Sequence, residues 1–268
     1  MTSPDGQWEI GNAYDQYVGR WSRKVAQAFL PWLGVPAQAD WLDVGCGTGA
    51  LSAELLAQAA PASLIGLDAS PAFVAHARQA TADPRARYEP GDAQQLPFER
   101  ASFDAAVCAL VLNFLPDPAR AVAEMARVVR PAGVVAAYVW DYADGMQMIH
   151  RFWRAAAELN ADAARLDEAV RFPLCRAGGL EALWTAAGLE TVAERSIDVA
   201  TVFESFDDFW RPFLGAQGPA PGYVAALDEA AREALRERLR ETLPATPVGS
   251  IRLSARAWAV RGRVPRAV

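Results

Sequence analysis

The stretch that decides the fold runs from Trp41 to Ala50 and reads WLDVGCGTGA. A short apolar strand leads through three closely spaced glycines, Gly45, Gly47 and Gly49, into a helix. Glycine after a strand permits a tight turn, and its missing side chain lets the backbone approach a ligand above the N-terminus of the next helix. The stretch therefore predicts a nucleotide-like cofactor.

Two cofactors compete for this loop. Gly45, Gly47 and Ala50 satisfy the dinucleotide pattern, and Asp68 follows at about the 20-residue interval expected of a ribose contact, so NAD fits the spacing. Asp43 argues against NAD, because its carboxylate would meet a pyrophosphate of like charge with no compensating cation. S-adenosylmethionine (SAM) has no phosphates and carries a sulfonium and an ammonium, so it suits an acidic strand end better.

Four ordered blocks of the chain carry a family resemblance. They are LDVGCGTG at 42–49, LIGLDASP at 64–71, GDAQQLPF at 91–98, and the segment 103–131 that begins FDAAVCALVLNF. Their order and spacing resemble the class I SAM-dependent methyltransferases, especially the bacterial branch that includes ubiquinone/menaquinone-type and other small-molecule methyltransferases. The resemblance implies the fold and the cofactor, and it says little about the methyl acceptor.

Composition narrows the class of protein. A chain of 268 residues with 52% hydrophobic and 22% charged residues predicts a folded globular protein. The net charge of −6 argues against a nucleic-acid partner, because nucleic-acid binding needs clustered basic charge.

The three cysteines lack CxxC spacing and predict reduced thiols in the cytoplasm. No signal pattern or bilayer-length apolar run is evident, so no membrane insertion is expected. The oligomeric state is left open.

Strand patterns alternate with helix patterns, which predicts an α/β, Rossmann-like doubly wound sheet. The expected strands are 41–45, 63–68, 85–90, 103–109 and 133–140, and the expected helices are 18–33, 48–59, 71–80 and 117–129. Segments 191–203 and 250–260 are also strand-like. The resemblance makes them the last of seven mostly parallel strands, with the final one antiparallel and inserted beside the sixth.

The chain is expected to form a single domain over 1–268 with helical additions. Residues 1–33 would form an N-terminal lid. Two long connections, about 141–188 and 204–248, carry amphipathic helical patterns and would form cap insertions. Such connections lie near the carboxyl edge of an open α/β sheet or on its flank, where ligands bind.

The resemblance assigns cofactor contacts residue by residue. Asp68 would accept hydrogen bonds from the ribose hydroxyls, although capping the next helix is an alternative that Ser70 already satisfies. Asp92 would bind the adenine amino group, and Asp43 would orient the methionine end or pin the loop. Cys46 is assigned small-residue packing and no nucleophilic role. The full set is Tyr14, Tyr17, Arg20, Asp43, Gly45, Cys46, Gly47, Asp68, Ala69, Asp92, Ala93 and Leu110.

The N-terminal stretch YDQYVGRW holds Tyr14, Tyr17, Arg20 and Trp21. Aromatic faces attract a sulfonium, and an arginine can clamp a carboxylate of SAM or of the acceptor. The resemblance to small-molecule methyltransferases implies that this stretch closes over the cofactor. The alternative is a surface helix whose aromatic side chains pack on the sheet edge.

A pocket for a small acceptor is expected from Trp21, Asn113, Phe114 and Trp140. His150 is the candidate general base for an acceptor that must lose a proton, with a packing role as the alternative. Asn113 and Phe114 do not form the Pro-containing tetrapeptide of DNA amino-methyltransferases. No metal site is expected, because Asp141 and Asp144 lack a third ligand at metal spacing.

The predicted function is SAM-dependent methyl transfer to a small, apolar or aromatic metabolite by in-line displacement. Positioning alone can supply much of the catalysis, so a dedicated catalytic residue is optional. The alternatives are a methyltransferase acting on RNA or protein, a non-catalytic SAM-binding regulator and, as the weakest, an NAD-dependent oxidoreductase.

Overall fold

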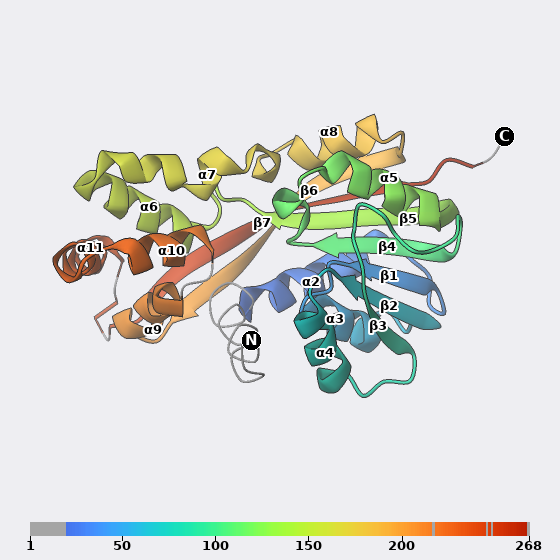
Figure 1. The fold of residues 1–268 in the computed structure, drawn as a ribbon, viewed down its shortest axis with the longest axis horizontal. Helices are drawn as coiled ribbons and strands as arrows, with labels where there is room; N and C mark the ends of the chain where they lie inside the picture. The colour runs from blue at the N-terminus through green and yellow to red at the C-terminus, as the bar shows by residue number, and fades with distance from the viewer. Residues whose placement is uncertain (1–19, 216–217, 245, 248, 267–268) are drawn as a thin grey trace. The chain divides into compact units, whose positions relative to one another are not determined.

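The computed structural model describes residues 20–266, apart from 216, 217, 245 and 248. Seven strands form one sheet in the order β3-β2-β1-β4-β5-β7-β6 (Figure 1). The strands are β1 (Asp40–Val44), β2 (Ser63–Asp68), β3 (Ala86–Pro90), β4 (Phe103–Ala109), β5 (Val129–Trp140), β6 (Glu190–Phe203) and β7 (Ile251–Arg263). The helices are α2 (Arg20–Leu33), α3 (Ala50–Gln58), α4 (Pro71–Ala80), α5 (Pro118–Val128), α6 (Gln147–Leu159), α7 (Glu168–Arg171), α8 (Gly179–Ala186), α9 (Phe206–Trp210), α10 (Pro219–Ala226) and α11 (Glu229–Thr242).

The direction of each strand follows from its pairing. β1 pairs in parallel with β2 and β4, β2 with β3, and β4 with β5. β7 is antiparallel to β5, because the Ala132 N–H donates to the Val264 carbonyl and the Asp141 N–H to the Arg256 carbonyl, each at 2.9 Å. The predicted seven-stranded sheet with an inserted antiparallel last strand is confirmed.

The described chain divides into two compact units. The sheet unit comprises Ser22–Val139, Ala177–Ile197 and 258–266, and the helical unit comprises 20–21, Trp140–Arg176 and Asp198–Ala257. The predicted lid, 1–33, lies partly outside the described residues. The expectation of one domain with two cap insertions stays a prediction.

Helices cover both faces of the sheet in the sheet unit. Figure 1 shows α5 and α8 on one face and α2, α3 and α4 on the other. The Phe29 ring of α2 lies 5.0 Å from the ring of Tyr138 on β5. On the opposite face, the buried Trp184 indole N–H donates to the Val135 carbonyl at 2.9 Å. Each large apolar side chain buried in this way contributes about 1.5–3 kcal/mol to folding.

Several strand boundaries differ from their predictions by one to three residues, and the start of β5 differs by four. β5 begins at Val129, not at 133, and the register moves from Phe103↔Val129 to Ala105↔Val134. Two residues of β4 are thus matched by five of β5, so the early part of β5 bulges. A Cβ on Gly133 would lie 2.6 Å from the Asp104 carbonyl oxygen, so the bulge needs glycine there.

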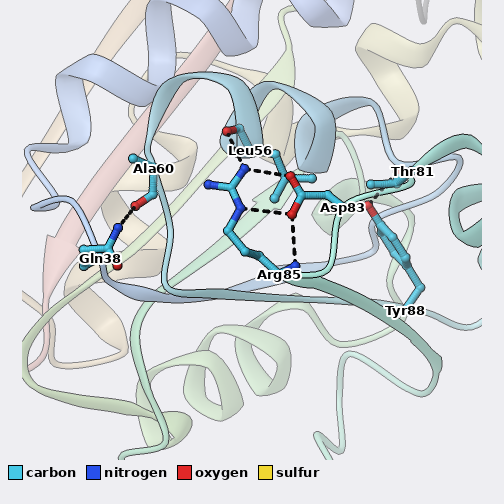
Figure 2. Close-up of polar contacts among 7 residues, drawn as sticks. All are labelled: Gln38, Leu56, Ala60, Thr81, Asp83, Arg85 and Tyr88. Atoms are coloured by element: carbon cyan, nitrogen blue, oxygen red, sulfur yellow. Dashed lines mark hydrogen bonds and ion pairs between the residues drawn. The ribbon is translucent and has the colours of Figure 1, made fainter.

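The turn before β3 is held by one arginine (Figure 2). Arg85 donates to the Asp83 carboxylate at 2.7 Å and to the Leu56 carbonyl at 3.4 Å, which ties the turn to the last residues of α3. The hydrogen bonds from Arg85 lower the pKa of Asp83 to about 2.

Among the described residues, no helix is long and apolar enough to cross a bilayer.

Candidate cofactor-binding site

Two of the three glycines in the loop after β1, Gly45 and Gly47, are needed there for different reasons. Gly45 and Gly47 have φ of +73° and +53°, a left-handed conformation that favours glycine. A Cβ on Gly45 would lie 2.5 Å from Cγ2 of Val111, which follows β4. A Cβ on Gly47 would meet no atom of the described residues within 4 Å. Gly45 therefore lets two loops pack together, and Gly47 leaves open space above the loop.

Asp68 ties the ends of β1 and β2 together. Its carboxylate accepts from the Gly47 N–H at 2.9 Å and from the Ser70 N–H at 2.8 Å. Ser70 caps α4 by accepting from the Phe73 N–H at 3.4 Å, as the sequence predicts. A carboxylate offers about four acceptor positions, so Asp68 keeps spare ones for two ribose hydroxyls.

Asp43 is fully buried behind the glycine loop. Its Oδ2 accepts from the Ser52 hydroxyl at 2.7 Å, while its Oδ1 has no hydrogen-bond partner among the described residues. Ser52 lies in the first turn of α3, so Asp43 pins that helix to the strand. Sequence reasoning missed Ser52, because a hydroxyl in a helix carries no distinctive signal. Burial, reinforced by the nearby charge of Asp68, raises the pKa of Asp43 to about 7.

This raised pKa predicts how stability depends on pH. The folded protein holds the Asp43 proton up to about pH 7, whereas the unfolded chain loses it near pH 4, so the free energy of unfolding falls between those values. A shift of about three units corresponds to about 4 kcal/mol. Glu168, whose pKa burial also raises to about 7, adds a similar fall. Denaturant unfolding of D43N from pH 4 to 8 should show about half the wild-type fall, and an unchanged fall would refute the assignment.

The loops after β3 and β4 complete the cofactor edge. Asp92 is exposed, and its Oδ1 accepts from the Gln94 N–H at 2.8 Å, which alone would explain an Asp in this turn. Ala93 beside it is buried. Leu110 has a φ of +61°, unusual for a residue other than glycine, and such strain collects at functional sites. All these residues follow carboxyl ends of neighbouring parallel strands, where α/β sheets bind ligands.

Cys46 lies between the two glycines and is buried. A Cβ on Gly66 would lie 3.1 Å from its Sγ, so the thiol packs closely against β2. Burial raises the pKa of the Cys46 thiol above its usual range, which keeps it neutral. These contacts fit the packing role that the resemblance assigns to Cys46.

The acceptor-pocket candidates lie in both units. In the sheet unit, Asn113 has a buried amide nitrogen with no hydrogen-bond partner among the described residues, and Phe114 is 55% exposed. In the helical unit, Trp21 is buried with its ring 5.3 Å from that of Phe203. Trp140 is also buried there, and its indole nitrogen has no partner within the described part of the chain. The unsatisfied Asn113 amide is the best-supported candidate, because burying an unpaired polar group is costly.

His150 lies on α6 in the helical unit. Burial raises the pKa of Asp167, at the start of α7, and His150 is near enough to oppose that rise. Sequence reasoning found no acid for His150, because Asp167 is brought near it only by the fold. Of the N-terminal candidates, Tyr14 and Tyr17 lie outside the described residues, and Arg20 is described only as the first residue of α2.

No group of three or more His, Cys, Asp or Glu residues that could hold a metal ion occurs within the described ranges. The open space at Gly47, the carboxylate of Asp68 and the unpartnered Oδ1 of Asp43 suit a cofactor with ribose hydroxyls and a positive charge. The fold and these loops define an α/β protein that binds a nucleoside cofactor.

Comparisons with known proteins narrow this class. Residues 42–137 match the model of the methyltransferase domain family. Trans-aconitate 2-methyltransferase of Deinococcus radiodurans is 40% identical over 101 residues, which are 38% of this chain and 38% of that protein. Demethylmenaquinone methyltransferase of the same organism is 39% identical over 94 residues, 34% of this chain and 39% of that protein. The chain spans about a third of the length of the curated relatives it matches.

The fold is similar to that of a solved structure, phosphoethanolamine N-methyltransferase 2 of Haemonchus contortus in complex with SAM. The TM-score is 0.61 at 16% identity, over 98% of this chain and 58% of that chain. Residues 42–137 thus match a methyltransferase domain, and the described chain shares its fold with a solved methyltransferase.

Proposed function

We propose that the protein transfers the methyl group of SAM to a small metabolite that is at least partly apolar or aromatic. The open glycine loop and the Asp68 carboxylate carry this proposal, because they form one edge of a methyltransferase domain. Bound SAM supplies an electrophilic methyl group on a sulfonium. The protein's own work is then to hold cofactor and acceptor in line, and such orientation is worth about 7–11 kcal/mol.

The proposed cofactor contacts follow the strand ends. Asp68 holds the ribose hydroxyls, Asp92 and Ala93 hold the adenine, and the glycine loop receives the methionine end with Asp43 behind it. The ammonium of the methionine end would favour ionised Asp43, against the burial that raises the pKa of this carboxyl.

A small acceptor is supported by two observations. The net charge of −6 gives no sign of the basic surface that nucleic acid requires. The relatives named above are methyltransferases of small molecules, trans-aconitate and demethylmenaquinone. We propose that Asn113 and Phe114 of the sheet unit contact the acceptor, and the acceptor role expected of Trp21 and Trp140 stays a prediction from the sequence. His150 would take the proton from acceptors that lose one. The three described free cysteines agree with action in the cytoplasm.

The test uses SAM labelled in its methyl group. The full chain is incubated with a panel of carboxylic acids, phenols and quinols, and in parallel with RNA and with protein, and D68A serves as the control. We expect label to enter a small molecule with wild type and far less with D68A. Label in RNA or protein alone would favour the first alternative. Cofactor binding with no transfer to any acceptor would favour a regulator.

A further inference from the structure

Three arginines gather near the last turn of α2 in the sheet unit. The guanidinium carbons of Arg195 on β6 and Arg261 on β7 lie 4.9 and 4.7 Å from the centre of the Trp32 ring. Arg195 donates to the Ala28 carbonyl at 2.8 Å, and Arg261 donates to the Trp32 carbonyl. Trp32 thus holds two cations close together. Arg263 lines the same pocket as Arg261.

Unlike Arg130 and Arg85 of the same unit, these arginines form no ion pair with an acid among the described residues. Arg130 forms ion pairs with Asp40 at 3.2 Å and with Asp104 at 2.7 Å. Arg85 pairs with Asp83 (Figure 2).

The three arginines near α2 hydrogen-bond only to backbone carbonyls, and Arg263 does so at Ala132, at 2.8 Å. No carboxylate of the described chain forms an ion pair with any of them, including Glu190 next to the pocket residue Thr191. Nε of Arg195 is buried, and no described residue forms a hydrogen bond with it.

A pocket of about 190 Å³ opens beside this cluster. Its lining includes Arg261, Arg263, Thr191, Gly34, Leu33 and Val134. A water molecule takes about 30 Å³ in the liquid, so the pocket has room for about six waters or for a small anionic group. A Cβ on Gly34 would lie 3.9 Å from Nη1 of Arg261, so the backbone stays close to the guanidinium.

The end of α2 explains only part of this charge. A helix C-terminus carries about half a negative charge, and cations there stabilise it. The guanidiniums of Arg261 and Arg263, which line the pocket, carry two full positive charges, so a net excess of positive charge is left there. Each guanidinium has five N–H donors in a planar fork, and the bonds to carbonyls leave donors unused. That fork matches the two oxygens of a carboxylate or phosphate.

We propose that this pocket binds an oxyanion group, a phosphate or a carboxylate, of a small ligand. The pocket is separate from the cofactor site. Its residues lie where β6 begins and β7 ends, whereas the cofactor loops follow the carboxyl ends of β1 to β4. Binding of an anion is favoured because it offsets the repulsion between neighbouring arginines. Burial and the charge of Arg261 lower the pKa of Arg195, and the contribution of Arg261 reflects that repulsion.

The experiment titrates the full chain with inorganic phosphate and, separately, with acetate, by calorimetry at constant ionic strength. We expect saturable binding of at least one anion, and the tighter one identifies the ligand's group. R263Q should weaken that binding about tenfold or more, because a charge-assisted hydrogen bond is lost. R252Q, a change at an exposed arginine elsewhere on β7, should leave it unaltered.

Arg261 packs over the Trp32 ring, so R261Q could also disturb the fold. The side chain of Arg263 is exposed, so R263Q is the variant that tests anion binding, and R261Q is measured beside it. Binding of S-adenosylhomocysteine to R263Q should equal that to wild type, which separates this pocket from the cofactor site. Absence of saturable binding of either anion would overturn the proposal. Equal anion binding by wild type, R263Q and R261Q would also overturn it.

Discussion

Replacing Asp68 by alanine should weaken the binding of S-adenosylhomocysteine by about 10- to 150-fold. The change removes a charged acceptor for the ribose, and hydrogen bonds to charged groups are worth about 1.5–3 kcal/mol. It also releases the Gly47 N–H, which Asp68 holds at 2.9 Å. Titration calorimetry measures the loss. D68N keeps one acceptor oxygen without the charge, so its affinity should fall between those of wild type and D68A.

The control for this change is D228A. Asp228 also accepts a backbone N–H, that of Ala231 at 2.8 Å, at the start of α11 in the helical unit. D228A therefore loses a comparable hydrogen bond to a backbone N–H and should keep wild-type affinity for S-adenosylhomocysteine. A folded D68A protein with unchanged affinity would remove Asp68 from the cofactor site.

Gly45 should be the most sensitive position for stability in the glycine loop. G45A places a Cβ in a left-handed conformation, which costs about 1–2 kcal/mol, and against Val111, where overpacking costs about 1–3 kcal/mol more. We expect the free energy of unfolding to fall by about 2–5 kcal/mol. Denaturant unfolding of the ligand-free protein measures this change.

Two variants separate the causes. G47A has the same backbone strain and open space around its Cβ, so it should lose only the smaller, conformational part of the stability. Its Cβ would occupy space that we assign to the cofactor, so its affinity for S-adenosylhomocysteine should fall. Combining G45A with V111A should recover part of the loss, giving a coupling energy in a double-mutant cycle. Equal losses for G45A and G47A would contradict close packing at Val111.

Local signals accounted for much of the fold. The predicted 63–68, 71–80 and 103–109 have the same bounds as β2, α4 and β4. The cap formed by Ser70 with Pro71 at the first helical position explains the match for α4. The start of β5 could not be predicted in the same way. Its bulge depends on pairing with β4, which lies more than 20 residues earlier in the chain.

The site was predictable where the motif is local. The glycine loop and Asp68 carry a spacing that points to a cofactor, and the structure brings them into contact. The partner of Asp43, the acid near His150 and the arginines around Trp32 join segments far apart in the sequence or lack a pattern. Periodicity reports which side a residue faces, and it does not report which side chain lies opposite.

A crystal structure of the full chain with S-adenosylhomocysteine tests the cofactor site most directly. We expect both ribose hydroxyls within hydrogen-bonding distance of the Asp68 carboxylate, the adenine beside Asp92 and Ala93, and the amino-acid end over Gly47. A ligand bound elsewhere, or a ribose that makes no contact with Asp68, would contradict the assignment of this edge of the sheet.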